Sequence, residues 1–175
     1  MVTRKIIYSL LITIFITSCG IFGDDIYDKK ALTYKNQFVF NNQFRMDGMY
    51  LMKDQYGIYL HYFFQNGSYY AEGISDKAET TCYQINSKAR EIPYAWGYFI
   101  IEENILKVQT YEANRSNNYN FKFRIRERWA EIVNDTTLYF FKAIDPNRKE
   151  RELDELFHFR HCENKPDSTN ILMRD

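Results

Sequence analysis

From Gln37 onward the chain alternates apolar and polar residues in short stretches, and each stretch ends at a tight-turn sequence. A period of two is that of a β-strand with one buried face, because successive side chains of a strand point to opposite faces. Asn66-Gly67, between two aromatic-rich stretches, is the strongest hairpin signal in the chain, and Glu103-Asn104 and Asn134-Asp135 mark further turns. The pattern therefore predicts antiparallel hairpins rather than a fold of long helices.

The predicted strands follow one another with short connections. They are residues 45–53, 58–65, 68–74, 96–102, 105–112, 119–126, 130–133, 136–144 and 156–161. Residues 86–91 predict one or two helical turns, which Pro93 ends because proline lacks the backbone N–H that a helix requires. Residues 148–155 are highly charged and predict either a short helix or a solvated loop.

About eight to ten short strands joined in sequence favour an all-β, mainly antiparallel meander with one short helix. A meander of about eight strands removes its exposed edges by closing into a barrel, and a two-sheet sandwich is the alternative. The composition agrees with a β-rich fold, because the chain has 15 Tyr and 14 Phe but only 7 Gly and 3 Pro.

Residues 119–126 show the clearest alternation. One face carries Tyr119, Phe121, Phe123 and Ile125, and the other carries Asn120, Lys122, Arg124 and Arg126. We expect the aromatic face to be buried in the barrel and the basic face, which Arg128 continues, to lie on the outside. There the basic row is either simply solvated or meets anionic headgroups or an acidic partner.

The first nineteen residues differ from the rest of the chain. A basic start at Arg4 and Lys5 precedes an apolar run over residues 6–16 and the sequence Ile16-Thr17-Ser18-Cys19. The run is about half of the roughly 20 residues that a membrane-spanning helix needs, which favours a cleaved signal peptide. Residues 16–19 resemble the lipobox of bacterial lipoproteins, and this resemblance implies acylation of Cys19 and attachment to a membrane. The alternative is an ordinary signal peptide cut before a cysteine that later pairs.

We divide the chain into four parts. These are a lipoprotein signal peptide (1–18), a lipidated flexible tether (19–35), a barrel domain (36–164) and a polar C-terminal tail (165–175). The tether has no consistent period and carries Asp24, Asp25 and Asp28. This acidic cluster resembles the sorting signals of some Bacteroidota lipoproteins, or it is a solvated linker.

Several longer motifs resemble small Bacteroidota envelope lipoproteins that have lipocalin-like barrels. The motifs occupy residues 44–50, 96–101, 105–109, 131–137 and 165–169. The resemblance implies a lipocalin-like meander barrel, anchored by lipid in the cell envelope, at the periplasmic or surface face of the outer membrane. Because these are strand and turn motifs, the resemblance transfers no functional residue.

Two cysteines remain in the mature chain once Cys19 is assigned to lipid. In an exported protein, an even pair such as Cys82 and Cys162 is first interpreted as a disulfide. Two separate thiols are the alternative, because the sequence does not show whether their Cα atoms approach closely enough.

Signals for catalysis are weak. The chain has no G-x-S-x-G nucleophile motif and no phosphate-binding glycine loop, and His158 and His161 would point to opposite faces of a strand. We therefore predict no catalytic residues, no cofactor and no metal site. Equal numbers of basic and acidic residues, 23 of each, exclude the basic field that nucleic-acid binding needs.

The inward aromatic positions are the candidate ligand site. We assign Tyr59, His61, Phe63, Phe121 and Phe123 to a cavity that either holds a ligand or is filled by these side chains. The predicted function is a non-catalytic, membrane-anchored binding module for a small hydrophobic or amphiphilic molecule. The alternative is a structural or accessory subunit that binds an envelope protein partner through its surface.

Overall fold

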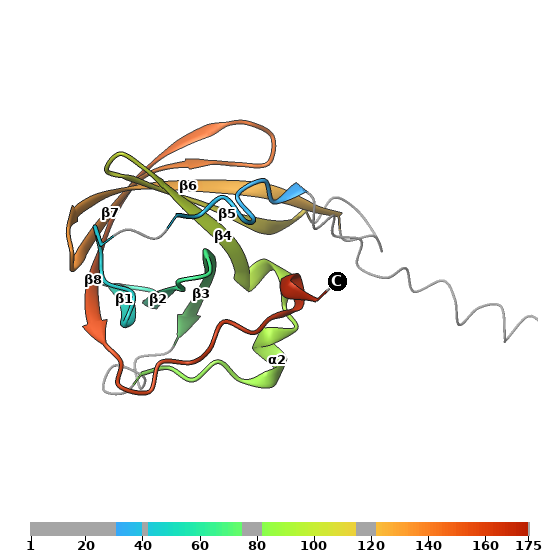
Figure 1. The fold of residues 1–175 in the computed structure, drawn as a ribbon. Coiled ribbons are helices and arrows are strands. Elements are labelled where there is room, and N and C mark those ends of the chain that lie inside the picture. The colour runs from blue at the N-terminus through green and yellow to red at the C-terminus, as the bar shows by residue number, and fades with distance from the viewer. Residues whose placement is uncertain (1–30, 40–41, 75–81, 115–121, 175) are drawn as a thin grey trace, which may run out of the picture.

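The computed structural model describes residues 31–39, 42–74, 82–114 and 122–174. Its eight strands form a closed antiparallel barrel in which every strand pairs with its neighbours in sequence and β8 pairs with β1 (Figure 1). The predicted all-β, lipocalin-like meander barrel with one short helix is therefore confirmed, and the two-sheet sandwich is excluded. The predicted signal peptide and Cys19 lie outside the described residues.

The elements follow the predicted hairpins. The strands are β1 (Gly48–Asp54), β2 (Gly57–Phe63), β3 (Ser68–Ile74), β4 (Trp96–Glu102), β5 (Ile105–Asn114), β6 (Lys122–Asn134), β7 (Thr137–Ile144) and β8 (Glu150–His161). The helical elements are α2 (Ser87–Arg90), η3 (Pro93–Ala95) and η4 (Ile171–Met173). Gly67, in the β2–β3 turn, has a φ of 79°, which a glycine adopts without steric cost.

Two strands differ from the prediction more than the others do. β6 is one strand of 13 residues, where the sequence predicted two, and β8 already begins at Glu150. The prediction of a helix or loop for residues 148–155 is thus wrong over most of its length. The charged residues fit a strand because they pair across the barrel wall, as Lys142 Nζ does with Glu150 Oε1 at 3.2 Å.

The interior of the barrel contains a cluster of buried side chains to which all eight strands contribute. Its members on the strands are Tyr50, Phe63, Tyr69, Phe99, Leu106, Val108, Ala130, Ile132, Leu138, Phe140 and Phe157. Many of these rings meet edge to face, a preferred aromatic geometry, as do those of Phe63 and Phe99 with centroids 5.2 Å apart. Much of the interior is therefore filled by aromatic side chains.

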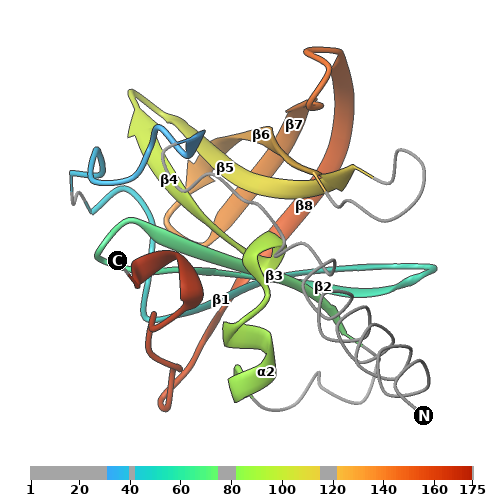
Figure 2. The ribbon, with the colours of Figure 1, turned by 90° about the vertical axis from the view of Figure 1, so that its right-hand side faces the viewer.

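One end of the barrel is closed by residues 42–47, which we call the strap. Gln43 Nε2 donates to Glu103 O in the β4–β5 turn at 2.7 Å, and Arg45 N donates to Asp135 O in the β6–β7 turn at 2.9 Å. Between these contacts Phe44 is buried, 5.2 Å from the ring of Phe63. Figure 2 places this light cyan segment, which leads into β1, at the end of the barrel opposite the β1–β2 turn. We call that opposite end the mouth.

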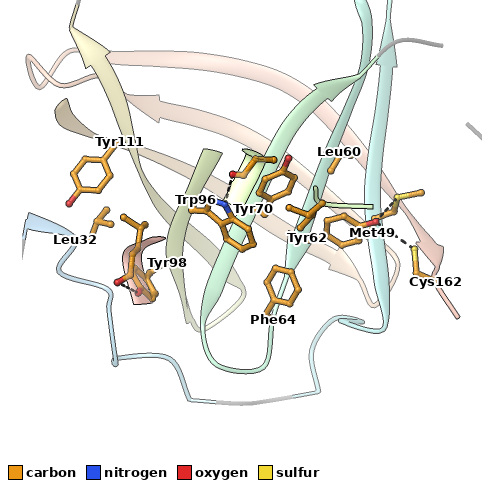
Figure 3. Packing of buried hydrophobic residues seen from close by; sticks show 13 residues of the cluster. Leu32, Met49, Leu60, Tyr62, Phe64, Tyr70, Trp96, Tyr98, Tyr111 and Cys162 are labelled. Carbon is orange, nitrogen blue, oxygen red and sulfur yellow. Dashed lines mark hydrogen bonds between the residues drawn. The ribbon is translucent and has the colours of Figure 1, made fainter. Parts of the chain in front are cut away.

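A second cluster covers the outer faces of β1–β5 (Figure 3). Trp96 lies at its centre and donates from Nε1 to Ala89 O of α2 at 3.0 Å, while Tyr62 donates from its hydroxyl to Tyr83 O at 2.8 Å. Because α2 and the terminal segments cover these strands, both of their faces are apolar. This explains why the sequence alternation is weak in residues 58–64 and 96–101.

The boundaries of the predicted tether and tail need correction. Residues 31–35, assigned to the tether, pack on the barrel: Leu32 is buried, and Tyr34 N donates to Gln109 Oε1 at 3.1 Å. In the predicted polar tail, Leu172 is buried in the same outer cluster. The physical reason is that the aromatic outer face of β1–β5 needs an apolar cover, and these segments supply part of it.

Cys82 and Cys162 form a disulfide, with their Cα atoms 5.6 Å apart and a sequence separation of 80 residues. The predicted pairing is confirmed. The bond attaches the chain just before α2 to the end of β8, beside the buried hydroxyl of Tyr62. Within the described residues, no helix is both long and apolar enough to cross a bilayer.

Candidate functional site

A pocket of about 350 Å³ lies at the mouth of the barrel. Its lining comes from β1, β2, β6 and β8 and combines apolar and charged side chains. The lining residues are Met52, Asp54, Tyr59, Arg126, Arg128, Arg151, Asp154, Glu155 and Phe157. We call this the mouth pocket.

The arginines reach the pocket because β6 has the opposite orientation to the one predicted. Arg128 lies directly across from Val108, a member of the interior cluster, and directly paired residues of neighbouring strands share a face. Phe123 instead contacts Tyr111 of the outer cluster, with ring centroids 6.0 Å apart. The prediction of an inward aromatic face and an outward basic face is therefore wrong for this strand.

Arg128 connects the pocket to the filled interior. Its guanidinium forms a close ion pair with Glu155, and its Nη1 lies 3.5 Å from His61 Nε2. The same guanidinium lies 4.5 Å from the ring centroid of Phe140, a cation–π distance. Both members of the ion pair are largely shielded from solvent, with 18% and 27% of their side chains exposed. A charged pair in the barrel interior is costly to desolvate, which makes this an unusual place for it.

His61 lies beneath Arg128 and is stacked on Phe157, with ring centroids 4.1 Å apart. Tyr69 and Phe140 meet it edge to face, with ring centroids 5.3 and 5.1 Å away. Burial, and then the charge of Arg128, hold the pKa of His61 well below its ordinary value of 6.5. Its Nδ1 has no hydrogen-bond partner among the described residues. His61 is therefore a neutral ring buried below the pocket, beneath Arg128.

The lowered pKa of His61 predicts a pH-dependent stability. Below about pH 6.5 the unfolded chain protonates this histidine while the folded chain does not, so the free energy of unfolding falls as the pH falls. In the wild type, this histidine lowers the free energy of unfolding by up to about 1.4 kcal/mol for each pH unit below 6.5. We expect His61→Phe to lack this decrease. Urea unfolding of both proteins between about pH 5 and pH 7 tests this. Parallel pH profiles would contradict it.

Arg126 and Arg151 have looser partners than Arg128. Both guanidiniums approach the same Asp145 carboxylate oxygen, at 3.7 and 3.9 Å, and Arg126 also lies 3.7 Å from Glu112. These separations exceed the roughly 2.7–2.9 Å of a charge-assisted hydrogen bond. The Nε of Arg126 is buried and, in the part of the chain that the structure describes, has no hydrogen-bond acceptor.

The structure separates the five residues predicted to line a cavity. Tyr59 lines the mouth pocket and His61 lies below it. Phe63 is part of the filled interior, Phe123 lies on the outer face, and Phe121 is outside the described residues. Of the five predicted residues, Tyr59 lines the mouth pocket, and none of the charged residues of its lining was predicted.

A partial signal for the arginines was present in the sequence. Ala130 and Ile132 follow Arg128 at intervals of two, so they share its face, and both are buried in the interior cluster. The opposite face also continues with apolar residues, Trp129 and Val133, so the alternation groups Arg126 and Arg128 with Ala130 and Ile132 but does not say which face is inward.

A second depression of about 660 Å³ lies between the strap and the C-terminal segment, and we call it the strap groove. Lys165 organises one side of it, donating from Nζ to Met46 O and to Phe63 O and lying 4.5 Å from the ring centroid of Phe64. Burial lowers the pKa of Lys165 to about 8. These contacts give Lys165 the role of fastening the C-terminal segment to the barrel.

Searches against protein-family models, curated proteins and solved structures found no match for this chain. Within the described residues, no group of three or more His, Cys, Asp or Glu side chains is placed to hold a metal ion.

Proposed function

We propose that this protein is an envelope lipoprotein that binds a small amphiphilic molecule in the mouth pocket without transforming it. The observation that carries the proposal is a pocket at one end of a closed barrel whose other end is closed by the strap. Barrels of about eight strands either fill their interior or hold one small ligand. In this barrel, aromatic side chains fill much of the interior, and a pocket remains at the mouth.

The lining of the pocket supports an amphiphile rather than a purely apolar ligand. Met52, Tyr59 and Phe157 offer apolar surface, while the arginines offer hydrogen-bond donors. The volume is at the lower end of the roughly 300–1,000 Å³ of small-molecule sites, so the ligand is small or only its end enters.

The placement of His61 supports binding rather than catalysis. A general acid or base must reach the reacting group within hydrogen-bond distance. The ring of His61 is instead stacked on Phe157 and bordered by Tyr69 and Phe140, and its Nε2 faces Arg128. It is therefore enclosed by the protein's own side chains.

The lipobox-like sequence at residues 16–19 supports attachment of the protein to a membrane through Cys19, and the proposal places it in the cell envelope, at the outer membrane. The Cys82–Cys162 disulfide supports export, because such bonds persist in oxidising compartments. Intact mass analysis of protein made in a lipid-modifying bacterium tests the anchor. An unacylated Cys19 would remove this part of the proposal.

Native mass spectrometry of the protein purified from its own host tests the binding function. We expect a bound small molecule that is released when the barrel is denatured. The strap groove is the one observation that favours the alternative, an accessory subunit, because a partner segment can lie in a groove of this size. A co-purifying protein without a small molecule would favour that alternative.

A further inference from the structure

We propose that the mouth pocket holds its ligand by an anionic group, a carboxylate or a phosphate, bound to the guanidinium of Arg126 with Arg151 beside it. This inference rests on the proposed binding function and specifies the chemical class of the ligand. Its basis is the difference between two of the three acids of the pocket, which are already engaged by close contacts, and two arginines that are not.

Two of the three acids that line the pocket have close partners. Glu155 forms a close ion pair with Arg128. Asp54 Oδ1 accepts hydrogen bonds from the backbone N–H groups of Tyr56 and Gly57, at 2.7 and 3.1 Å, and so holds the β1–β2 turn. Asp154 lies near Tyr139, whose pKa burial and then this carboxylate raise. Asp54 and Glu155, two of the three acids in the lining, are thus engaged by contacts within the fold.

Arg126 and Arg151, in contrast, have only long ion-pair contacts. Glu112 and Asp145, the acids nearest to them, lie 3.7 to 3.9 Å away and are outside the pocket lining. A buried donor without an acceptor is unfavourable, and the Nε of Arg126 is one. The pocket lining contains three acids and three arginines. The hydrogen-bonding groups that still lack close partners are therefore mainly the donors of Arg126 and Arg151.

An anionic oxygen pair matches this capacity. A guanidinium presents two parallel N–H donors that carboxylates and phosphates accept together, and such charge-assisted bonds are stronger in a partly desolvated site than in water. With the anionic group at Arg126, the apolar part of the ligand lies against Met52, Tyr59 and Phe157. Arg128 is already paired and serves as the floor.

A matched pair of fluorescent probes tests the inference. Anilinonaphthalene sulfonate carries an anionic group, and N-phenylnaphthylamine has the same ring system without it. Both clusters of buried residues are built within residues 31–174, so acylation is not needed to form them. The titrations therefore use the mature chain from residue 19 with Cys19→Ser. We expect the anionic probe to bind at least about 10-fold more tightly than the neutral one.

Variants identify the residue responsible. We expect Arg126→Gln to weaken the anionic probe about 10- to 100-fold and to leave the neutral probe unchanged. Arg126→Lys, which keeps the charge but loses the paired donors, should fall between the two. Arg148→Gln is the matched control, because Arg148 is an exposed arginine of the β7–β8 turn outside the pocket lining. Thermal unfolding of each variant verifies the fold. If Arg126→Gln does not fold, the affinity of Arg151→Gln for the anionic probe is measured instead, and the same weakening is expected.

Competition distinguishes the source of the anionic group. Octanoate, octyl phosphate, inorganic phosphate and octanol are each used to displace the anionic probe. Displacement by octanoate or octyl phosphate, with octanol weaker, supports a carboxylate or phosphate amphiphile, and displacement by inorganic phosphate alone supports a free anion. Equal binding of both probes, insensitive to Arg126, overturns the anionic inference while leaving the binding function in place. If neither probe binds, the binding function itself is overturned.

Discussion

Truncating Phe63 to alanine is expected to lower the free energy of unfolding by about 3–5 kcal/mol. Phe63 is 1% exposed and its ring meets those of Phe44, Tyr50 and Phe99 at 5.2 to 5.7 Å. Removing it leaves a cavity that these rigid rings cannot fill, because the barrel wall fixes their positions. Urea unfolding of wild type and Phe63→Ala at neutral pH measures the difference.

The matched control is Phe123→Ala. Phe123 was predicted to share the cavity with Phe63, but it lies half-buried on the outer face, so we expect a clearly smaller loss. The comparison distinguishes a filled interior from a ligand cavity at Phe63. If Phe63→Ala proved as mild as Phe123→Ala, the interior around Phe63 would be loosely packed and the aromatic cluster would not be the core.

Replacing Cys82 and Cys162 together with serine is expected to cost about 3–4 kcal/mol of unfolding free energy. The bond closes a loop of about 80 residues in the unfolded chain, and removing it restores the entropy of that loop. The serine at position 162 would also be buried beside Tyr62. Urea unfolding of the double variant, compared with the oxidised wild type, measures the loss.

The single substitution Cys19→Ser is the control for the double variant, because it leaves the Cys82–Cys162 disulfide in place. We expect Cys19→Ser to unfold at the same urea concentration as the parent chain when both are unacylated. Equal stability of the double serine variant and the oxidised parent would mean that the cross-link does not constrain the unfolded chain as argued.

The turns of the fold could be predicted because their chemistry is local. Asn66-Gly67 was assigned as a turn from the residue types alone, and Gly67 indeed has a positive φ. The glycine also has a packing reason that the sequence does not contain, since a Cβ at this position would lie 2.6 Å from Phe38 Cβ. The Asn-Gly sequence therefore predicts the turn, and the contact with Phe38 explains why a residue with a side chain does not fit at position 67.

The charged first half of β8, residues 150–155, could not be predicted because its signal is not local. Residues 148–155 have little apolar alternation, and their strand conformation depends on the ladder with β7, which pairs Lys142 with Glu152 and Ile144 with Glu150. Backbone pairing and ion pairing with β7 stabilise a segment whose own strand preference is weak. The terminal segments were misassigned for the same reason, since only the outer aromatic face gives Leu32 and Leu172 a place to be buried.

The amino-acid sequence alone determined that this chain forms a meander of antiparallel hairpins, because strand periodicity and turn chemistry act between residues close in the chain. It also determined which residues of β6 share a face. The tertiary structure alone decided which face points inward, and it placed Arg126 and Arg128 inside and Phe123 outside. The physical reason is that alternation is symmetric between the two sides of a strand. Closure of the barrel, and the cover that α2 and the terminal segments give its outer wall, break that symmetry.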